Sequence, residues 1–210
     1  MKYAVNGLQM KKIDEYTIDV TGIPSPVLME KAAMSVVDVM QKTIHKKDRI
    51  LAVCGTGNNG GDGIAAARIL YHLGYHADIL LLGNEEKCSD ETKVQLNIAR
   101  NIGLNIFNQL DVNEYNIIVD AIFGIGLSRP VTGEYASMID QINQLPGRVY
   151  SIDIPSGISS DDGKILNAAI KADETITFGL LKLGHLLYPG SEYAGIVTVS
   201  DIGFPKEAYM

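Results

Sequence analysis

Beyond residue 48 the chain alternates between short apolar segments and helical segments, and this alternation constrains the fold more than any other feature. The apolar segments contain few polar side chains, which is typical of strands covered on both faces. Strand–helix alternation with short connections implies right-handed crossovers and a mostly parallel sheet. We therefore predict a three-layer α/β fold of Rossmann type, with helices on both faces of the sheet. The strands are expected at 49–55, 76–83, 104–107, 116–124, 148–157, 173–179 and 195–203.

The helices between these strands carry recognisable start and stop signals. Ser89 is placed to cap the start of one helix, and Gly74 and Gly103 follow the last turns of two of them. The helices are expected at 63–74, 89–103 and 133–145.

Two more helices are expected before the first strand, as an added layer. Residues 6–20 are predicted to form a short amphipathic helix that carries Leu8, Ile13 and Tyr16. In the second helix, Ser25 suits the N-cap and Pro26 the first helical position. Since no linker is visible, residues 1–210 are predicted to form a single domain.

Composition narrows the class of protein. Apolar residues make up 46% of the 210 and charged residues 20%, which is ordinary for a soluble globular protein. The net charge of −7 argues against a nucleic-acid partner, but not against a phosphorylated ligand held by backbone N–H groups. Cys54 and Cys88 form neither a metal motif nor a disulfide framework, and no apolar run is long enough to span a membrane. A cytoplasmic protein without a membrane partner is expected.

Three polar, glycine-rich segments follow predicted strands. They are "GTGNNGGDG" at 55–63, Asp120 with the "AIFGIGLSRPVTGEY" that follows it, and Asp153 with "IPSG". Ligands of open α/β sheets bind beyond the carboxyl ends of the strands, so these segments predict a binding site. An aspartate that ends a strand is also often only a turn or cap residue.

The segment "GTGNNGGDG" matches the dinucleotide pattern G-x-G-x-x-G, but a lone match is weak evidence. It is not a Walker loop, because no Lys-Ser/Thr follows the glycines. A dehydrogenase would need an acidic residue about 20 positions further on, and Glu85 or Glu86 fits that place only loosely. Asn58, Asn59 and Asp62 go beyond the pattern and add oxygen ligands and N–H donors.

Ser156 invites interpretation as a nucleophile, which the sequence does not favour. "IPSG" is not G-x-S-x-G, and no histidine stands out as its base. Three of the four histidines are predicted away from the strand ends, at His45, His72 and His76. Ser156 is therefore expected to act as a hydroxyl ligand.

Taken together, these motifs resemble the NAD(P)H-hydrate epimerases, the YjeF N-terminal domain family. The matching stretches are "QMKKIDEYTIDVTGIPSPVLMEKAA", "GTGNNGGDGIAAARIL", "DAIFGIGLSRPVTGEY", "SIDIPSGISSDDGKI" and "ADETITFGLLKLGHLLYPGSEYAGIVTV". The resemblance implies epimerisation of the R and S forms of hydrated NADH or NADPH. It also implies a functional partner, an S-specific dehydratase that uses ATP or ADP, and suggests a homodimer.

The resemblance further implies roles for individual residues. The nucleotide would contact Asp153 and two segments, Asn58, Asn59, Gly60, Gly61 and Asp62, and Gly124, Ile125, Gly126, Leu127, Ser128, Arg129 and Pro130. A potassium ion would be held by Asn59, Asp120 and Ser156.

The chemistry requires an acid for the departing hydroxyl, a base for the returning water and negative charge beside the cation between them. One carboxyl group can serve all three functions in turn. We expect Asp153 to do so, as the catalytic residue.

Departures from the family pattern leave points open. Lys31 and Ala33 stand where the family often has asparagine and glycine, and Lys182 is either a phosphate ligand or a solvated loop residue. The chain is either a stand-alone epimerase or a piece of a bifunctional protein. The alternatives are a non-catalytic scaffold module, as in relatives from mRNA decapping, and an NAD-dependent dehydrogenase.

Overall fold

The computed structural model describes residues 4–209, and its main element is a seven-stranded sheet in which all neighbouring strands are parallel. The strand order is β4-β3-β2-β5-β6-β7-β9. This confirms the predicted sheet, including the strand expected at 104–107, of which Ile106–Phe107 is formed. The strands are β2 (Arg49–Cys54), β3 (His76–Leu81), β4 (Ile106–Phe107), β5 (Ile117–Ala121), β6 (Arg148–Ile152), β7 (Glu174–Phe178) and β9 (Ile196–Ser200). A separate parallel pair joins β1 (Ala4–Val5) to β8 (Leu181–Lys182).

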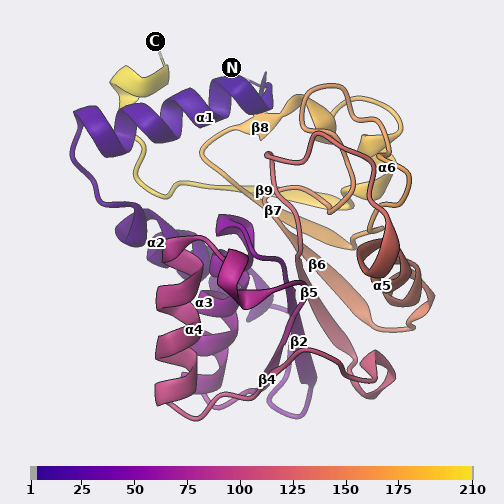
Figure 1. The fold of residues 1–210 in the computed structure, drawn as a ribbon. Helices are drawn as coiled ribbons and strands as arrows, with labels where there is room; N and C mark the ends of the chain where they lie inside the picture. Colours follow the sequence, from indigo (N-terminus) through magenta and orange to yellow (C-terminus); the bar gives the residue numbers. More distant parts are fainter. Residues whose placement is uncertain (1–3, 210) are drawn as a thin grey trace.

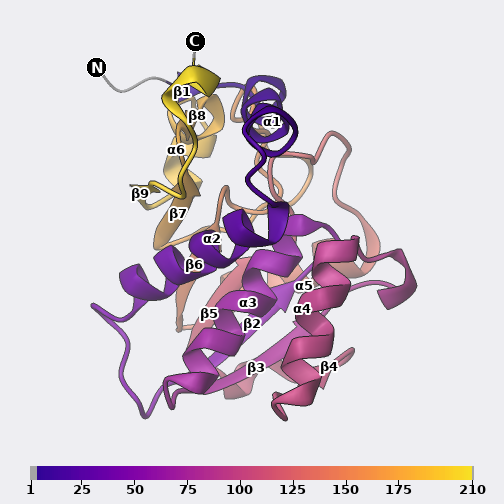
Figure 2. The same ribbon diagram turned by 90° about the vertical axis from the view of Figure 1, so that its left-hand side faces the viewer.

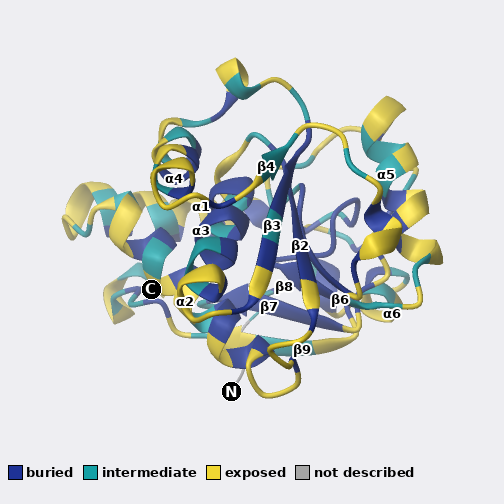
Figure 3. Ribbon diagram, turned by 90° about the horizontal axis from the view of Figure 1, so that it is seen from below, coloured by how far each residue is buried: buried dark blue, intermediate teal, exposed yellow. Residues whose placement is uncertain are grey.

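Helices cover both faces of the sheet, so the three-layer prediction is confirmed (Figures 1 and 2). On one face lie α2, α3 and α4, and on the other lies α5. Figure 3 shows that the strands between them are mostly buried. The helices are α1 (Gly7–Glu15), α2 (Ser25–Met40), α3 (Asn58–His72), α4 (Asp90–Asn101), α5 (Gly133–Gln144) and the short α6 (Gly190–Tyr193).

Strand β2 shows why the predicted strands are apolar throughout. Ala52 and Cys54 belong to the core beneath α2 and α3, whereas Leu51 and Val53 belong to the core beneath α5. Alternate side chains point to opposite faces of a strand, so a strand with helices on both faces needs apolar residues at every position.

The prediction that the N-terminal helices form an added layer is wrong for α2. Helix α2 packs beside α3 within one layer, since the small residues Ala32 and Ala33 are buried there. Its predicted start is also wrong by one position. Pro24 is the N-cap, and Val27 N donates to Pro24 O at 2.9 Å, so Ser25 is already helical.

Helix α1 lies across the carboxyl edge of the sheet instead of on a face (Figure 1). The helix expected at 6–20 exists, but it changes to a π-helical turn at Tyr16–Val20. Met10 and Ile13 are buried, whereas Leu8 is 62% exposed and does not face the core as an amphipathic helix would suggest.

The predicted start signal Ser89 and the predicted stop signals Gly74 and Gly103 are confirmed. The Ser89 side chain accepts from Thr92 N at 3.3 Å, and Gly74 and Gly103 have φ of +82° and +80°. The predicted start of α3 is wrong. The sequence predicts a loop up to residue 62, whereas the helix begins at Asn58 and includes most of the glycine-rich segment.

Strands β2 and β5 are neighbours, and the chain leaves them toward opposite edges of the sheet. After β2 the chain builds β3 and β4 on one side; after β5 it builds β6, β7 and β9 on the other. Such a switch point opens a crevice at the carboxyl ends of the strands, where ligands of this fold class bind. In residues 4–209, no helix has the length and apolarity needed to cross a membrane.

Candidate active site

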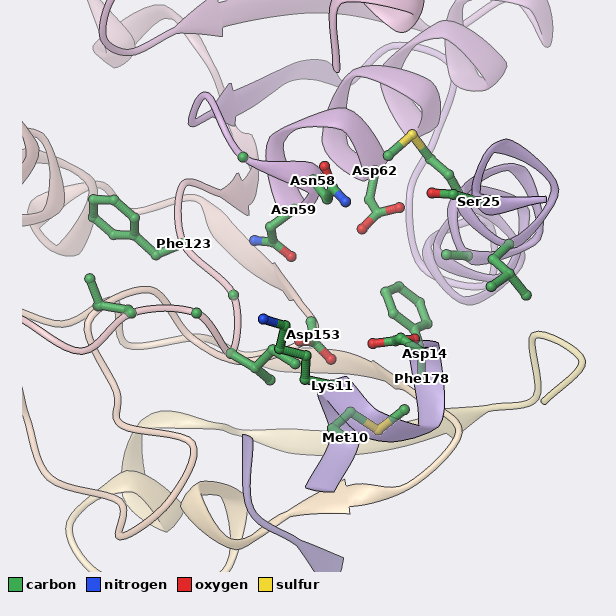
Figure 4. Close-up of a pocket in the computed structure, with 18 of the residues that line it drawn as sticks. Met10, Lys11, Asp14, Ser25, Asn58, Asn59, Asp62, Phe123, Asp153 and Phe178 are labelled. Atoms are coloured by element: carbon green, nitrogen blue, oxygen red, sulfur yellow. The ribbon is translucent and has the colours of Figure 1, made fainter. Parts of the chain in front are cut away.

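The segment "NNGGDG" forms the first turns of α3 and places the helix N-terminus at the crevice. Gly57 is the N-cap, with φ −86° and an extended ψ. The first backbone N–H groups of a helix have no intrahelical partner, so they are available to an anionic ligand. Asn58, Asn59 and Asp62 project from these turns into the crevice (Figure 4).

The glycines of this segment are needed because backbone packs against backbone. A Cβ at Gly60 would lie 1.9 Å from Gly55 O, and a Cβ at Gly55 would lie 2.1 Å from Ile122 O. A Cβ at Gly63 would meet the Cβ of Ala121 at 2.4 Å. The glycines therefore bring α3 against the ends of β2 and β5.

This packing gives a prediction about stability. Gly60→Ala is expected to lower the free energy of unfolding by about 3 kcal/mol or more, because the added methyl group overlaps a carbonyl oxygen that cannot move aside. Gly57→Ala is the matched control, since among the described residues no atom beyond its own part of the chain lies within 4 Å of its Cβ position. It should cost less than about 1 kcal/mol. Urea unfolding of both variants tests this, and equal losses would contradict it.

A cavity of about 760 Å³ occupies the crevice. Most of the predicted nucleotide-binding residues line it, and Thr56, Phe123 and the α1 residues Lys11 and Asp14 line it as well. The lining residues from the prediction are Asn58, Asn59, Asp62, Gly124, Ile125, Gly126, Leu127, Ser128, Arg129 and Asp153. The residues of this set that do not line it are Gly60 and Gly61, which are buried in α3, and the exposed Pro130.

Asp120 and Ser156 lie beneath the cavity and are fully buried. Ser156 Oγ donates to Asp120 Oδ1 at 2.5 Å and Ser156 N donates to Oδ2 at 2.9 Å. Ser151 Oγ adds a bond to Oδ2 at 2.7 Å. Burial raises the pKa of Asp120, and these bonds oppose the rise. Ser156 Oγ donates to a carboxylate and not to a histidine, which agrees with the expectation that Ser156 is no nucleophile.

Asn59 adjoins the same group of residues. Its side-chain oxygen lies next to Gly124, where an added Cβ would be 3.2 Å from it. Gly124 follows Phe123, whose backbone N donates to Ser156 Oγ at 2.9 Å. Asn59 Nδ2 is buried without a hydrogen-bond partner among the described residues. A buried amide donor of this kind needs a partner, and a ligand in the cavity can provide one.

Asp153 lies at the end of β6 in a strained backbone conformation. Its φ is +68°, which is uncommon for a residue other than glycine, and Ile154 N donates to Ile152 O at 2.9 Å around it. Strain of this kind persists where the surroundings fix the conformation, and it is concentrated at functional sites. The γ-turn aims the carboxylate into the cavity.

Lys182 is the buried partner of Asp153, so the prediction of a solvated loop lysine is wrong. Its Nζ donates to Asp153 Oδ1 at 2.5 Å, Thr177 Oγ1 at 2.7 Å and Phe178 O at 3.1 Å. The residue is 1% exposed. A lone lysine between leucines, in "GLLKLG", is the sequence signal that points to a buried ion pair.

His185 is a second residue that the sequence analysis overlooked. Its Nε2 lies 2.9 Å from Asp153 O, and its Nδ1 accepts from Lys182 N at 3.1 Å. With Nδ1 as an acceptor, Nε2 carries the proton and donates. Burial, helped by the charge of Lys182, lowers the pKa of His185 to about 4, so the ring is neutral at pH 7 and holds the Asp153 backbone.

Asp14 is a third overlooked residue. It reaches the cavity from α1, while Asp62 reaches it from α3 and Asp153 from the end of β6 (Figure 4). Burial and the charge of Asp153 raise the pKa of Asp14 to about 7. Burial also raises the pKa of Asp62 well above its usual value, with Asp153 and Asp14 adding to the effect.

The remaining sequence candidates lie outside the cavity. Lys31 and Ala33 do not line it. Ala33 is packed in the core, and the Lys31 ammonium lies next to Gly203. Glu85 forms a two-fold ion pair with Arg100, at 2.8 and 2.5 Å. That pairing occupies Glu85, one of the two acids that a dehydrogenase interpretation could use.

Comparison with known proteins gives consistent matches. The family model described as "YjeF-related protein N-terminus" matches residues 25–184. An NAD(P)H-hydrate epimerase of Oenococcus oeni is 45% identical over 95% of this chain and 96% of its own length. One of Weissella koreensis is 41% identical over 99% and 95%. The crystal structure of the yeast protein ynu0, YNL200c, has a TM-score of 0.83 at 21% identity and covers 98% of this chain and 91% of its own, which shows a shared fold.

Proposed function

The chain belongs to the family of the YjeF-related protein N-terminus, and on that premise we propose that it is an NAD(P)H-hydrate epimerase. It is an isomerase that interconverts the R and S forms of hydrated NADH and NADPH. The observation in the structure that carries this activity is the Asp153 carboxylate, which faces a cavity at the switch point of the sheet.

The cavity suits a dinucleotide substrate. Its 760 Å³ is within the range of pockets for small ligands. The first N–H groups of α3, which have no intrahelical partner, are available to phosphate oxygens, and Arg129 adds a cation to the cavity lining. The nucleotide thus extends between the first turn of α3 and the segment 124–129, with the nicotinamide end toward Asp153.

The reaction takes place at the carbon that carries the added hydroxyl, next to the ring nitrogen. The nitrogen lone pair expels the hydroxyl as water once its oxygen is protonated, and a planar iminium remains. Water then adds to the other face and gives up a proton. The Asp153 carboxylate lies beside the iminium and accepts that proton, with Oδ1 fixed by Lys182 and Thr177. Among the described residues no donor binds Oδ2, which is therefore available to the substrate.

The residues beneath the cavity fit a potassium ion. Asp120, Ser156, Asn59 and the nearby Phe123 carbonyl supply oxygen atoms, the ligands that this ion prefers. Asp120 is buried and bonded only to neutral donors among the described residues, so it lacks a positive partner. Potassium would supply that charge and hold the segment after β5 against the segment after β6.

The rival functions have less support. The intact set of Asn59, Asp120, Asp153 and Ser156, together with a net charge of −7, favours catalysis over an RNA-associated scaffold. We place the enzyme in the cytoplasm, upstream of an S-specific ADP- or ATP-dependent dehydratase. A homodimer, suggested by the family resemblance alone, completes the proposal.

A coupled repair assay tests the activity. Purified R-hydrate of NADPH is supplied with an S-specific dehydratase and ATP, and NADPH is followed by its absorbance. The dehydratase alone should leave the R-hydrate largely unrepaired. Addition of this protein should make repair complete.

The same assay tests the potassium proposal. Replacing potassium with choline at equal ionic strength should lower the epimerisation rate, and returning potassium should restore it. An unchanged rate after exhaustive removal of potassium would contradict a role for the ion. It would leave the epimerase activity in place.

A further inference from the structure

The cavity contains a second carboxyl group that the sequence-based account, with Asp153 as the only acid and base, does not use. Asp14 reaches the cavity from α1, which lies across the carboxyl edge of the sheet (Figure 4). No hydrogen bond to its carboxyl occurs among the described residues. The group is therefore free to act on a ligand.

Asp14 and Asp153 have different electrostatic environments. Asp153 is paired with the buried ammonium of Lys182 and receives a further bond from Thr177 Oγ1 at 3.2 Å. Among residues 4–209 no cation forms an ion pair with Asp14, and Asp62 from α3 adds a third acidic group nearby. Two carboxyl groups whose environments differ in this way commonly divide the work of acid and base.

We propose that Asp14 protonates the departing hydroxyl of the hydrate, while Asp153 accepts the proton of the water that returns to the opposite face. The inference rests on the proposed epimerisation and divides between two residues the functions that one was expected to perform. A ligand at this place is also indicated by Asn59, whose buried Nδ2 lacks a partner in the described part of the chain.

The step balances. The Asp14 proton moves to the hydroxyl oxygen, the carbon–oxygen bond breaks, and the nitrogen lone pair forms the carbon–nitrogen double bond as water leaves. A second water forms a bond to the carbon on the other face, the double-bond electrons return to nitrogen, and Asp153 takes the released proton. Transfer of that proton from Asp153 to Asp14 restores the enzyme. No oxidant or reductant is needed.

Electrostatics support the protonated form of Asp14 as the donor. Burial, together with the charges of Asp153 and Glu15 and against that of Lys182, raises the pKa of Asp14 to about 7. Lys11 of α1 and Asp62 of α3 are the other charged groups that line the cavity near it. The acid form is present below about pH 7 and is lost as the pH rises through that value, so kcat/KM should fall above it.

The decisive variant is Asp14→Asn, which keeps the size of the side chain and removes its proton. Its kcat/KM for epimerisation should fall about 100-fold or more. The Kd for unhydrated NADPH, used as the binding probe, should stay within about threefold, because the change does not touch the phosphate-binding N-terminus of α3. Asp19→Asn, the same change at an exposed position one turn further on, should behave like the wild type.

The outcomes separate this inference from the proposed function. An inactive wild type would overturn both. An active wild type together with a fully active Asp14→Asn variant would overturn only the role of Asp14.

The pH profile of the wild type is an independent test that does not depend on the variant's folding. A fall of about tenfold per unit above pH 7 that the residual activity of Asp14→Asn does not share supports the inference. A wild-type profile that stays flat to pH 9 would overturn it.

Discussion

Asp153→Asn is expected to lower kcat for epimerisation about 1000-fold or more. In the proposed mechanism the substitution removes the negative charge beside the iminium and the base for the returning water, and each of these contributes factors of about 100 to 1000. Asparagine is the right replacement because, like aspartate, it adopts the φ of +68° at this position more readily than alanine does. Rates measured from either pure epimer, at saturating substrate, test this.

The control for this variant is binding. The Kd for NADPH should change little, since the α3 N-terminus and segment 124–129 are unaffected. Full activity in Asp153→Asn would contradict the assignment of Asp153 as the catalytic residue. Loss of binding together with activity would show that the residue positions the nucleotide instead.

Lys182→Met is expected to lower the free energy of unfolding by about 3–5 kcal/mol. The variant leaves the Asp153 carboxylate, whose side chain is only 12% exposed, without its cation, and it breaks the bonds to Thr177 and Phe178. Activity should fall as well, mainly in kcat, because Oδ1 of Asp153 keeps only the bond from Thr177. Urea unfolding and steady-state kinetics measure the two effects.

A double-mutant cycle separates the ion pair from simple packing. The double variant with Asp153→Asn and Lys182→Met has neither charge, so no unpaired charge is buried. It should be more stable than the sum of the two single losses predicts. It should nonetheless stay inactive. Lys164→Met is the matched control, because its ion pair with Asp162 is exposed and its loss should change little. Additive losses would contradict a buried, mutually stabilising pair.

Much of the fold could be predicted because it depends on local sequence patterns. The strands of the main sheet follow from apolar runs, since a strand covered on both faces has no polar side, as β2 shows. Asp120 and Asp153 could be singled out because the carboxyl ends of parallel strands share one edge. The end of α3 was predicted by Gly74, which adopts the left-handed conformation.

The start of α3 was missed for a physical reason. Asparagine and glycine are poor helix formers, so "NNGGDG" is predicted to be a loop. In the structure, close contacts of Gly60 with Gly55 and of Gly63 with Ala121 stabilise the first turns, and such tertiary packing has no local signature.

The overlooked site residues depend on long-range contacts. Lys182 reaches Asp153 because β8 pairs with β1 at the other end of the chain, with Val5 opposite Lys182. Asp14 enters the cavity because α1 crosses the edge of the sheet. Neither arrangement could be inferred from periodicity or spacing, although both residues lie in stretches that carry the family resemblance.

The most direct test of the account follows the stereochemistry itself. The purified protein is incubated separately with the pure R-hydrate and the pure S-hydrate of NADPH, without dehydratase, and the epimers are resolved by chromatography against an enzyme-free control. If the chain is an epimerase, both reactions reach the same equilibrium mixture much faster than the control, with oxygen from labelled water entering the ring hydroxyl. Epimers that remain as unchanged as in the control would contradict it.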